Sequence, residues 1–321
     1  MDKTKLSQFK TQFATDVFHG LTTFPKKISS KYFYDEKGDD LFQQIMDLPE
    51  YYLTGKEFDI LKENKADIGE AFTSKEGFDL IELGAGDGKK TKVLLRHFTE
   101  AGYDFNYLPV DISGNVLEQL TQSLETEISG LRVDPQQGTY AEVLDRLSTY
   151  KKRKKVILFL GSNIGNLLQE QAIGFLRKIS AAMQAEDLLF IGIDQKKHPK
   201  KVLGAYNDPT GVTAAFNKNL LTRINRELDA NFDPETFLHW PVYNPESGVA
   251  KSYLVSKKEQ TVQINSLNLE VVFGKWETIH TEVSQKYDDH SVGWLAQEAG
   301  LTIVESFSDS ENYFKDYIFK K

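Results

Sequence analysis

The chain contains no cysteine among its 321 residues. This absence excludes disulfide bonds, thiolate metal ligands and cysteine nucleophiles, and it is typical of proteins in reducing compartments. The first residues, 1–7, contain no apolar signal region. No stretch approaches the roughly 20 apolar residues that a membrane-spanning helix needs. We therefore expect a soluble cytoplasmic protein that does not bind a membrane.

Histidines are also few, and acidic residues outnumber basic ones. None of the six histidines has a metal-ligand spacing such as His-x-x-x-His, so no metal site is expected. Asp289 and His290 are adjacent, but no serine elbow accompanies them, which makes a hydrolase a poor interpretation. The net charge of −8, from 47 acids and 39 bases, disfavours a nucleic-acid surface. The one basic run, residues 151–155, is expected to be an exposed loop.

The most informative stretch is a short apolar run followed by glycines. Phe78–Leu83 predicts a buried parallel strand, Gly84–Gly88 a tight loop, and Lys89–Phe98 a helix. Glycine allows positive φ and close approach of a ligand, and a helix N-terminus attracts anions. The Gly-x-Gly-x-Gly spacing matches neither the dinucleotide fingerprint nor a phosphate loop. A simple turn is the alternative.

The next predicted strand, Phe105–Ile112, carries Asp111 near its carboxyl end. An acid at this position accepts the ribose hydroxyls of a bound nucleoside. The loop and the acid together fit either a dinucleotide or S-adenosylmethionine. The latter has no phosphate, and its methionine carboxylate would be held by Lys90 and the helix amides.

Strands and helices alternate from residue 77 to residue 195. Further strands are predicted at Val156–Leu160 and Leu188–Asp194, with a weak one at Arg132–Tyr140, and Ser113 is expected to cap a helix. This alternation predicts an α/β fold with a parallel, doubly wound, Rossmann-like sheet and ligands at the carboxyl ends of its strands.

The pattern changes after residue 196. A helix through Leu228 is followed by alternating strands between Phe237 and Ser284, which predicts an inserted α+β domain that binds the substrate. The expected organisation is residues 1–60 as the helical N-terminal part of this substrate domain, 61–195 as the core, 196–286 as the insert and 287–321 as the return to the core sheet. In the N-terminal part, Asp39 or Asp40 is expected to cap a helix through Met46.

Several stretches together resemble the S-adenosylmethionine-dependent L-histidine Nα-methyltransferases of ergothioneine biosynthesis. The glycine loop alone is a weak signal, whereas the stretches that begin at Leu160 and Tyr206 are far more specific. The matching stretches, in the order of the family, are Tyr32-Phe-Tyr-Asp-Glu-Lys-Gly with Asp40-Leu-Phe, Leu48-Pro-Glu-Tyr-Tyr-Leu-Thr, Glu82-Leu-Gly-Ala-Gly-Asp-Gly-Lys-Lys-Thr, Tyr107-Leu-Pro-Val-Asp-Ile-Ser, Leu160-Gly-Ser-Asn-Ile-Gly-Asn-Leu, Tyr206-Asn-Asp-Pro-Thr-Gly-Val-Thr-Ala-Ala-Phe-Asn and Thr281-Glu-Val-Ser-Gln-Lys-Tyr.

The resemblance implies three successive methyl transfers to the α-amine of histidine, which give the trimethyl betaine hercynine, with no metal. Tyr34 and Phe42 would line the methyl-acceptor end. By the same resemblance, the donor would meet Gly84, Gly86, Lys90, Asp111, Thr139, Tyr140, Gly161 and Ser162. The acceptor would meet Tyr51, Asn166 and Tyr206 around its backbone groups, and Glu282, Val283 and Ser284 around its imidazole.

The chain departs from the family at two positions. Thr139 stands where many members have Asp, which removes a carboxylate partner for the adenine amino group. Ser252 stands where a methionine is common, which alters the side-chain pocket. Three alternatives stay open: a methyltransferase of the same fold for another amino acid or small amine, a dinucleotide-dependent oxidoreductase, and a silent S-adenosylmethionine-binding regulator. A monomer is the working expectation for the oligomeric state.

Overall fold

A computed structural model describes residues 9–150 and 153–321. The chain forms two compact units. We call Leu53–Lys196 together with Gln285–Lys321 the core unit, and the residues up to Tyr52 together with Lys197–Ser284 the second unit. No helix in the described part of the chain is long and apolar enough to cross a membrane.

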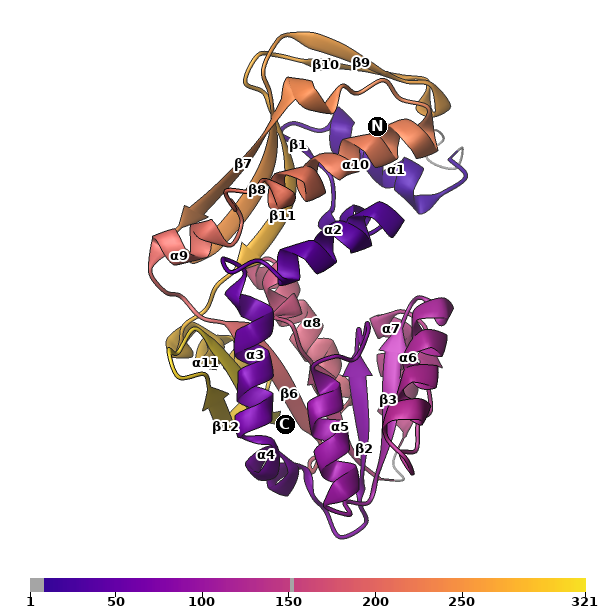
Figure 1. The fold of residues 1–321 in the computed structure, drawn as a ribbon, viewed down its shortest axis with the longest axis vertical. Coiled ribbons are helices and arrows are strands. Elements are labelled where there is room, and N and C mark those ends of the chain that lie inside the picture. The colour runs from indigo at the N-terminus through magenta and orange to yellow at the C-terminus, as the bar shows by residue number, and fades with distance from the viewer. Residues whose placement is uncertain (1–8, 151–152) are drawn as a thin grey trace. The chain divides into compact units, whose positions relative to one another are not determined.

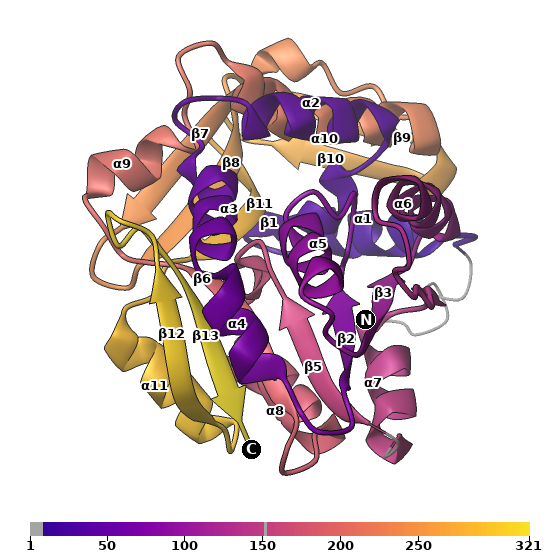
Figure 2. The ribbon, with the colours of Figure 1, turned by 60° about the horizontal axis from the view of Figure 1, so that its bottom comes forward.

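The core unit is built on a seven-stranded sheet in the order β12-β13-β6-β5-β2-β3-β4 (Figure 2). Strands β2 to β6 are parallel, and β13 and β12 run antiparallel at one edge. The strands are β2 (Phe78–Leu83), β3 (Phe105–Asp111), β4 (Gln136–Gln137), β5 (Lys154–Phe159), β6 (Leu188–Asp194), β12 (Thr302–Ser308) and β13 (Phe314–Lys320). The predicted Rossmann-like sheet is confirmed. The third predicted strand was too long, because β4 contains only Gln136 and Gln137, while Val133 makes an isolated bridge to Tyr107 of β3.

Helices cover both faces of this sheet, as the doubly wound prediction requires. One face packs on α3 (Tyr52–Glu63), α4 (Lys65–Phe72), α5 (Thr91–Glu100) and α6 (Gly114–Glu127). The other packs on α7 (Tyr140–Thr149), α8 (Gln169–Ala182) and α11 (Asp289–Glu298). Neighbouring strand residues divide between the two cores: Leu80 belongs to the first and Ile81 to the second, and both are fully buried. The pleat of the strands thus explains their continuous apolar runs.

The expectation of an exposed basic loop was wrong for part of that run. Lys154 and Lys155 belong to β5, and Lys155 is fully buried with its Nζ 2.8 Å from Asp187 Oδ2. Residues 151 and 152 lie outside the described residues. A buried lysine needs such a partner, since its unpaired charge would be costly. The pairing with Asp187, 32 residues away, could not be seen in a local charge run.

The second unit contains a four-stranded sheet in the order β1-β11-β8-β7, a separate β9–β10 hairpin and three longer helices (Figure 1). Its core joins Leu220, Leu221 and Ile224 of α10 to Leu254 and Ile279 of the sheet. The helix predicted through Leu228 is confirmed as α10. The elements are α1 (Gln12–Thr22), β1 (Lys26–Lys27), η2 (Ser30–Phe33), α2 (Glu36–Met46), α9 (Pro199–Gly204), α10 (Val212–Leu228), β7 (Phe237–Asn244), β8 (Val249–Ser256), β9 (Gln260–Ile264), β10 (Leu269–Phe273) and β11 (Thr278–Gln285).

The predicted cap of α2 was placed too late in the chain. Asp35 caps the helix, because its Oδ1 accepts a hydrogen bond of 2.8 Å from Gly38 N, and Asp39 and Asp40 lie inside the first turns. Asn219 Nδ2 and Arg226 Nη2 of α10 also donate to Asp35, at 2.8 and 2.6 Å. These partners from α10 favour Asp35 over the other acids of the stretch.

Candidate functional site

The glycine loop after β2 lies directly beneath Tyr140. Gly84 has φ +75°, and its amide donates to Val110 O at 2.8 Å. A Cβ atom on Gly84 would collide with the Tyr140 hydroxyl, so only glycine fits at this point. Burial raises the pKa of Tyr140 to about 12, with further contributions from the carboxylates of Asp111 and Glu82. The structure therefore brings Gly84, Asp111 and Tyr140 together at the carboxyl ends of β2 and β3.

Asp111 is the last residue of β3, and Thr139 follows the end of the neighbouring strand β4. Asp111 is half-buried and its Oδ1 accepts a hydrogen bond from Ser113 N at 2.9 Å. Thr139 caps α7 together with Glu142: the Thr139 amide and hydroxyl each lie 2.8 Å from Glu142 Oε2. A carboxylate, that of Glu142, therefore lies beside Thr139.

Lys90 and Gly161 are held by one buried carboxylate that the sequence analysis missed. Glu57 of α3 pairs with Lys90 Nζ, and Gly161 N donates to both Glu57 oxygens at 2.8 and 2.9 Å. Gly161 and Ser162 both have positive φ, and Ser162 Oγ accepts from Asp194 N at 2.9 Å. The role of Glu57 could have been suspected from the spacing of Leu53, Glu57, Ile60 and Leu61. This spacing places an acid on the apolar face of a helix.

In the second unit, four aromatic rings form a cluster. Tyr34 and Phe42 meet edge to face with centroids 5.5 Å apart, and Tyr51 lies 6.2 Å from Phe42. Phe216 of α10 completes the cluster at 5.7 Å from Tyr34 and 5.9 Å from Phe42. The first three were predicted as site residues. Phe216 was not, although it falls within the specific stretch that begins at Tyr206.

Electrostatic contacts connect this cluster to the predicted imidazole site. The Tyr34 side chain is 45% exposed overall. Burial around its hydroxyl, followed by the charges of Glu282 and Asp39 and the neighbouring Tyr206, raises the pKa of Tyr34 well above 10. Tyr206 and Glu282, which are far from Tyr34 in the sequence, therefore both lie near its hydroxyl in the folded second unit.

Glu282 on β11 is held by a serine of the neighbouring strand. Ser252 Oγ on β8 donates to Glu282 Oε2 at 2.9 Å, and only 1% of Ser252 is exposed. Thr281 Oγ1 donates to the Ser252 carbonyl at 3.0 Å, which fixes the two strands side by side. Val283 is half-buried and Ser284 is buried on the same strand.

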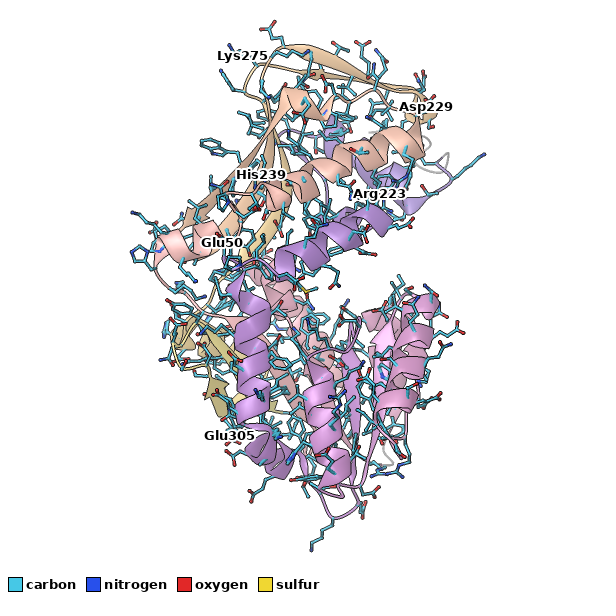
Figure 3. All side chains as sticks on the ribbon, viewed as in Figure 1. Glu50, Arg223, Asp229, His239, Lys275 and Glu305 are labelled. Carbon is cyan, nitrogen blue, oxygen red and sulfur yellow. The ribbon has the colours of Figure 1, made fainter. Side chains whose placement is uncertain are left out.

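The backbone carbonyl of Tyr206 is hydrogen-bonded to His239, a histidine that belongs to no recognisable sequence motif. His239 Nε2 lies 2.8 Å from Tyr206 O, and its Nδ1 lies 2.8 Å from Asn217 Nδ2 (Figure 3 labels His239 on β7). A carbonyl only accepts, so Nε2 carries the proton and Nδ1 accepts from the amide. Burial lowers the pKa of His239, in agreement with this neutral tautomer. Only the fold reveals this contact, since His239 follows Tyr206 by 33 residues.

Asp208 organises the start of α10, two residues after Tyr206. Its carboxylate accepts from Val212 N at 3.0 Å, Thr213 N at 2.7 Å and Thr210 Oγ1 at 2.5 Å. Burial alone would raise the pKa of Asp208, but these hydrogen bonds outweigh it and hold the pKa well below 3.8. The specific stretch around Tyr206 is therefore explained in part by Asp208, which precedes the N-cap residue Gly211 and accepts from the first amides of α10.

Replacing Asp208 by Ala is expected to lower the free energy of unfolding by about 0.5–2 kcal/mol at pH 7, the usual value of a helix cap. Because the folded-state pKa is depressed, the contribution is present above the unfolded pKa of about 4 and is lost as the pH falls through the folded-state value. Urea unfolding of both proteins from pH 7 downward measures this. A difference that grows as the pH falls would contradict the assignment.

Asn166 is the one residue predicted to bind the methyl acceptor that belongs to the core unit and not to the second unit. It ends the short helix η3 (Asn163–Asn166) of the core unit and is exposed. Tyr51, Tyr206, Glu282 and Ser284 belong to the second unit. Among the described residues, there is no group of three or more His, Cys, Asp or Glu side chains that could hold a metal ion.

Comparison with known proteins gives one consistent family. Residues 13–321 match the profile of a family described as "Histidine-specific methyltransferase, SAM-dependent". A histidine N-alpha-methyltransferase of Mycobacterium tuberculosis is 35% identical over 93% of this chain and 92% of its own length, and one of Mycolicibacterium smegmatis is 37% identical over the same shares. Ergothioneine biosynthesis protein 1 of Schizosaccharomyces pombe is 30% identical over 92% of this chain and 39% of its own length.

Proposed function

Because the chain belongs to the S-adenosylmethionine-dependent histidine-specific methyltransferases, we propose that it methylates the α-amine of L-histidine three times and releases hercynine. The observation that favours histidine as the acceptor is the Glu282 carboxylate. Ser252 donates a hydrogen bond to it, and its charge contributes to the raised pKa of Tyr34. A dinucleotide-dependent oxidoreductase and a silent regulator do not agree with this family of N-methyltransferases.

The donor site has the residue types that S-adenosylmethionine requires. Lys90 would pair with the methionine carboxylate, Asp111 would accept the ribose hydroxyls, and the loop at Gly84 leaves backbone accessible. Gly86, Gly161 and Ser162 would complete the cradle, and Thr139 and Tyr140 would lie beside the adenine. Bound S-adenosylmethionine supplies an electrophilic methyl group, so the chain's own residues need only position the amine in line with it.

The acceptor amine would lie against the aromatic cluster. The ring faces of Tyr34 and Phe42 would tolerate an amine as it becomes quaternary, since cation–π attraction of about 0.5–2 kcal/mol survives the loss of N–H donors. The raised pKa of Tyr34 keeps its phenol protonated at neutral pH. We therefore assign Tyr34 to positioning of the amine.

The remaining contacts would select histidine. Glu282 is suited to accept from one imidazole N–H, and Ser284 to pair with the other ring nitrogen, with Val283 between them. Tyr51, Asn166 and Tyr206 would bind the amino acid's backbone groups. An apolar side chain in this site would leave Glu282 unpaired, which costs more than a missing contact.

A methyltransferase for another amino acid or small amine is the second candidate. Ser252 favours it, because a small hydroxyl residue where methionine is common leaves a more polar pocket beside Glu282. The cytoplasmic location and the absence of a nucleic-acid partner stay predictions from composition, and the monomeric state stays a working expectation.

Mass spectrometry of a reaction with S-adenosylmethionine and L-histidine, followed over time, tests the proposal. Mono-, di- and trimethylated histidine should appear in that order. Accumulation of a mono- or dimethylated product as the end point would refute the trimethylation. No methylated histidine, with donor binding intact by calorimetry, would refute histidine as the acceptor and direct the search to other amines.

A further inference from the structure

Asp316 is a fully buried acid whose carboxylate has no hydrogen-bond partner among the residues that the structure describes. It lies on β13, directly opposite Gly192 of β6 in the antiparallel register. Phe314 and Ile318, two residues away on either side, are core residues of the same sheet. An acid at such a position needs a reason, because an unpaired buried charge is costly.

The missing side chain of Gly192 allows Asp316 to face Glu57. A Cβ atom on Gly192 would overlap Glu57 Oε1 and would lie 2.9 Å from Asp316 Oδ1. Both oxygens thus approach the same point above β6, one from α3 and one from β13. Two carboxyl groups meet here in a site closed to solvent, since neither Glu57 nor Asp316 is exposed.

The surrounding charges decide which of the two acids is ionised. Glu57 pairs with Lys90 and accepts from Gly161 N, so both of its oxygens already have a partner. Burial first, and the charge of Glu57 second, raise the pKa of Asp316 well above 3.8, while Lys90 opposes the shift. Glu82, a further buried acid near Lys90, already accepts hydrogen bonds from Thr91 and Tyr107.

We propose that Asp316 is a positioning residue that stays protonated and donates its proton to Glu57, which fixes the carboxylate that holds Lys90 and Gly161. The pair then carries one negative charge, balanced by Lys90, as in other sites where two carboxyl groups share a proton. This role rests on the proposed function, because the contacts of Lys90 and Gly161 with the donor come from it.

Infrared difference spectroscopy tests the protonation directly. The spectrum of the wild type minus that of Asp316→Asn at pH 8 should contain the C=O stretch of a protonated carboxylic acid, which shifts in D₂O. Asp309 provides the matched control: it is 3% exposed on the adjoining turn, but accepts from Tyr313 N and Phe314 N at 2.7 Å. Asp309→Asn should remove ionised-carboxylate bands instead. Loss of such bands in Asp316→Asn would overturn the proposal.

Calorimetric titration with S-adenosylmethionine tests the positioning. Asp316→Asn keeps an N–H group that can donate a hydrogen bond to Glu57, so its affinity for S-adenosylmethionine should stay within about twofold of the wild type. Asp316→Ala removes this hydrogen bond to Glu57 and should bind S-adenosylmethionine roughly tenfold more weakly. Equal affinities of the alanine and asparagine variants would refute the positioning role. If the alanine variant does not fold, the infrared test of Asp316→Asn still decides the protonation.

The two proposals fail in different ways. A wild-type protein that methylates histidine but lacks the acid band at Asp316 would refute only the shared proton. A wild-type protein that shows the band and binds S-adenosylmethionine, yet makes no methylated histidine, would refute only the acceptor assignment.

Discussion

Replacing Glu282 by Ala is expected to weaken histidine binding roughly 10- to 150-fold, the effect of losing a hydrogen bond of about 1.5–3 kcal/mol to a charged group. The carboxylate is held in place before the substrate arrives, because Ser252 Oγ donates to its Oε2 at 2.9 Å. Little reorganisation is then needed to receive an imidazole N–H. The residues proposed to bind S-adenosylmethionine, Gly84, Lys90 and Asp111, belong to the other unit, so the affinity for this ligand should change less than about threefold.

Two further variants separate charge from geometry at this position. Glu282→Gln keeps an oxygen acceptor but loses the charge, and should fall between the wild type and the alanine variant. Ser252→Ala keeps the charge but removes the hydroxyl that orients it, and should weaken histidine binding by about 2- to 10-fold, since a net hydrogen bond contributes about 0.5–1.5 kcal/mol. Titration calorimetry with each ligand measures all three. Equal losses for donor and acceptor would mean that Glu282 only maintains the fold.

Replacing Gly84 by Ala is expected to weaken S-adenosylmethionine binding by roughly 10- to 100-fold. A Cβ atom at this position would collide with the Tyr140 hydroxyl, and the backbone has φ +75°. The strained backbone alone costs about 1–3 kcal/mol for a residue other than glycine. The loop would have to move away from Tyr140. This movement would displace the backbone that is proposed to contact S-adenosylmethionine.

Gly86 provides the matched control for this substitution. It also has positive φ, at +54°, but a Cβ atom there would meet nothing within 4 Å. Gly86→Ala therefore adds backbone strain and a methyl group in the proposed cradle, but no collision with protein atoms, and its loss of affinity for S-adenosylmethionine should be the smaller one. Adding Tyr140→Phe to Gly84→Ala removes the obstructing hydroxyl and should restore part of the affinity. Identical losses for Gly84→Ala and Gly86→Ala would show that the contact with Tyr140 has no role.

The sequence was sufficient for the parts of the fold that depend on local periodicity. The bounds predicted for β2 and β6 agree with the structure residue for residue, and Ser113 caps α6 as expected. Buried strands leave continuous apolar runs, and a cap acts on amides only three residues away. The glycine loop, with Asp111 on the next strand, was readable for the same reason.

Local patterns were misleading where a distant partner decides the outcome. Asp35 rather than Asp39 or Asp40 caps α2, and its carboxylate also binds Asn219 and Arg226 of α10. Lys155 is buried because Asp187 lies next to it in space. No charge count along the chain contains that information, since ion pairs and hydrogen bonds act over a few ångströms regardless of separation in sequence.

The sequence by itself determined the family, the alternation that builds the parallel sheet, and the residue types at the ends of its strands. Only the tertiary structure decided how those residues are held: Glu282 by Ser252, Tyr206 by His239, and Lys90 by Glu57 opposite Asp316. The physical reason is burial. A carboxyl group taken out of water must find a proton or a counter-charge, and the fold brings that partner from a distant part of the chain.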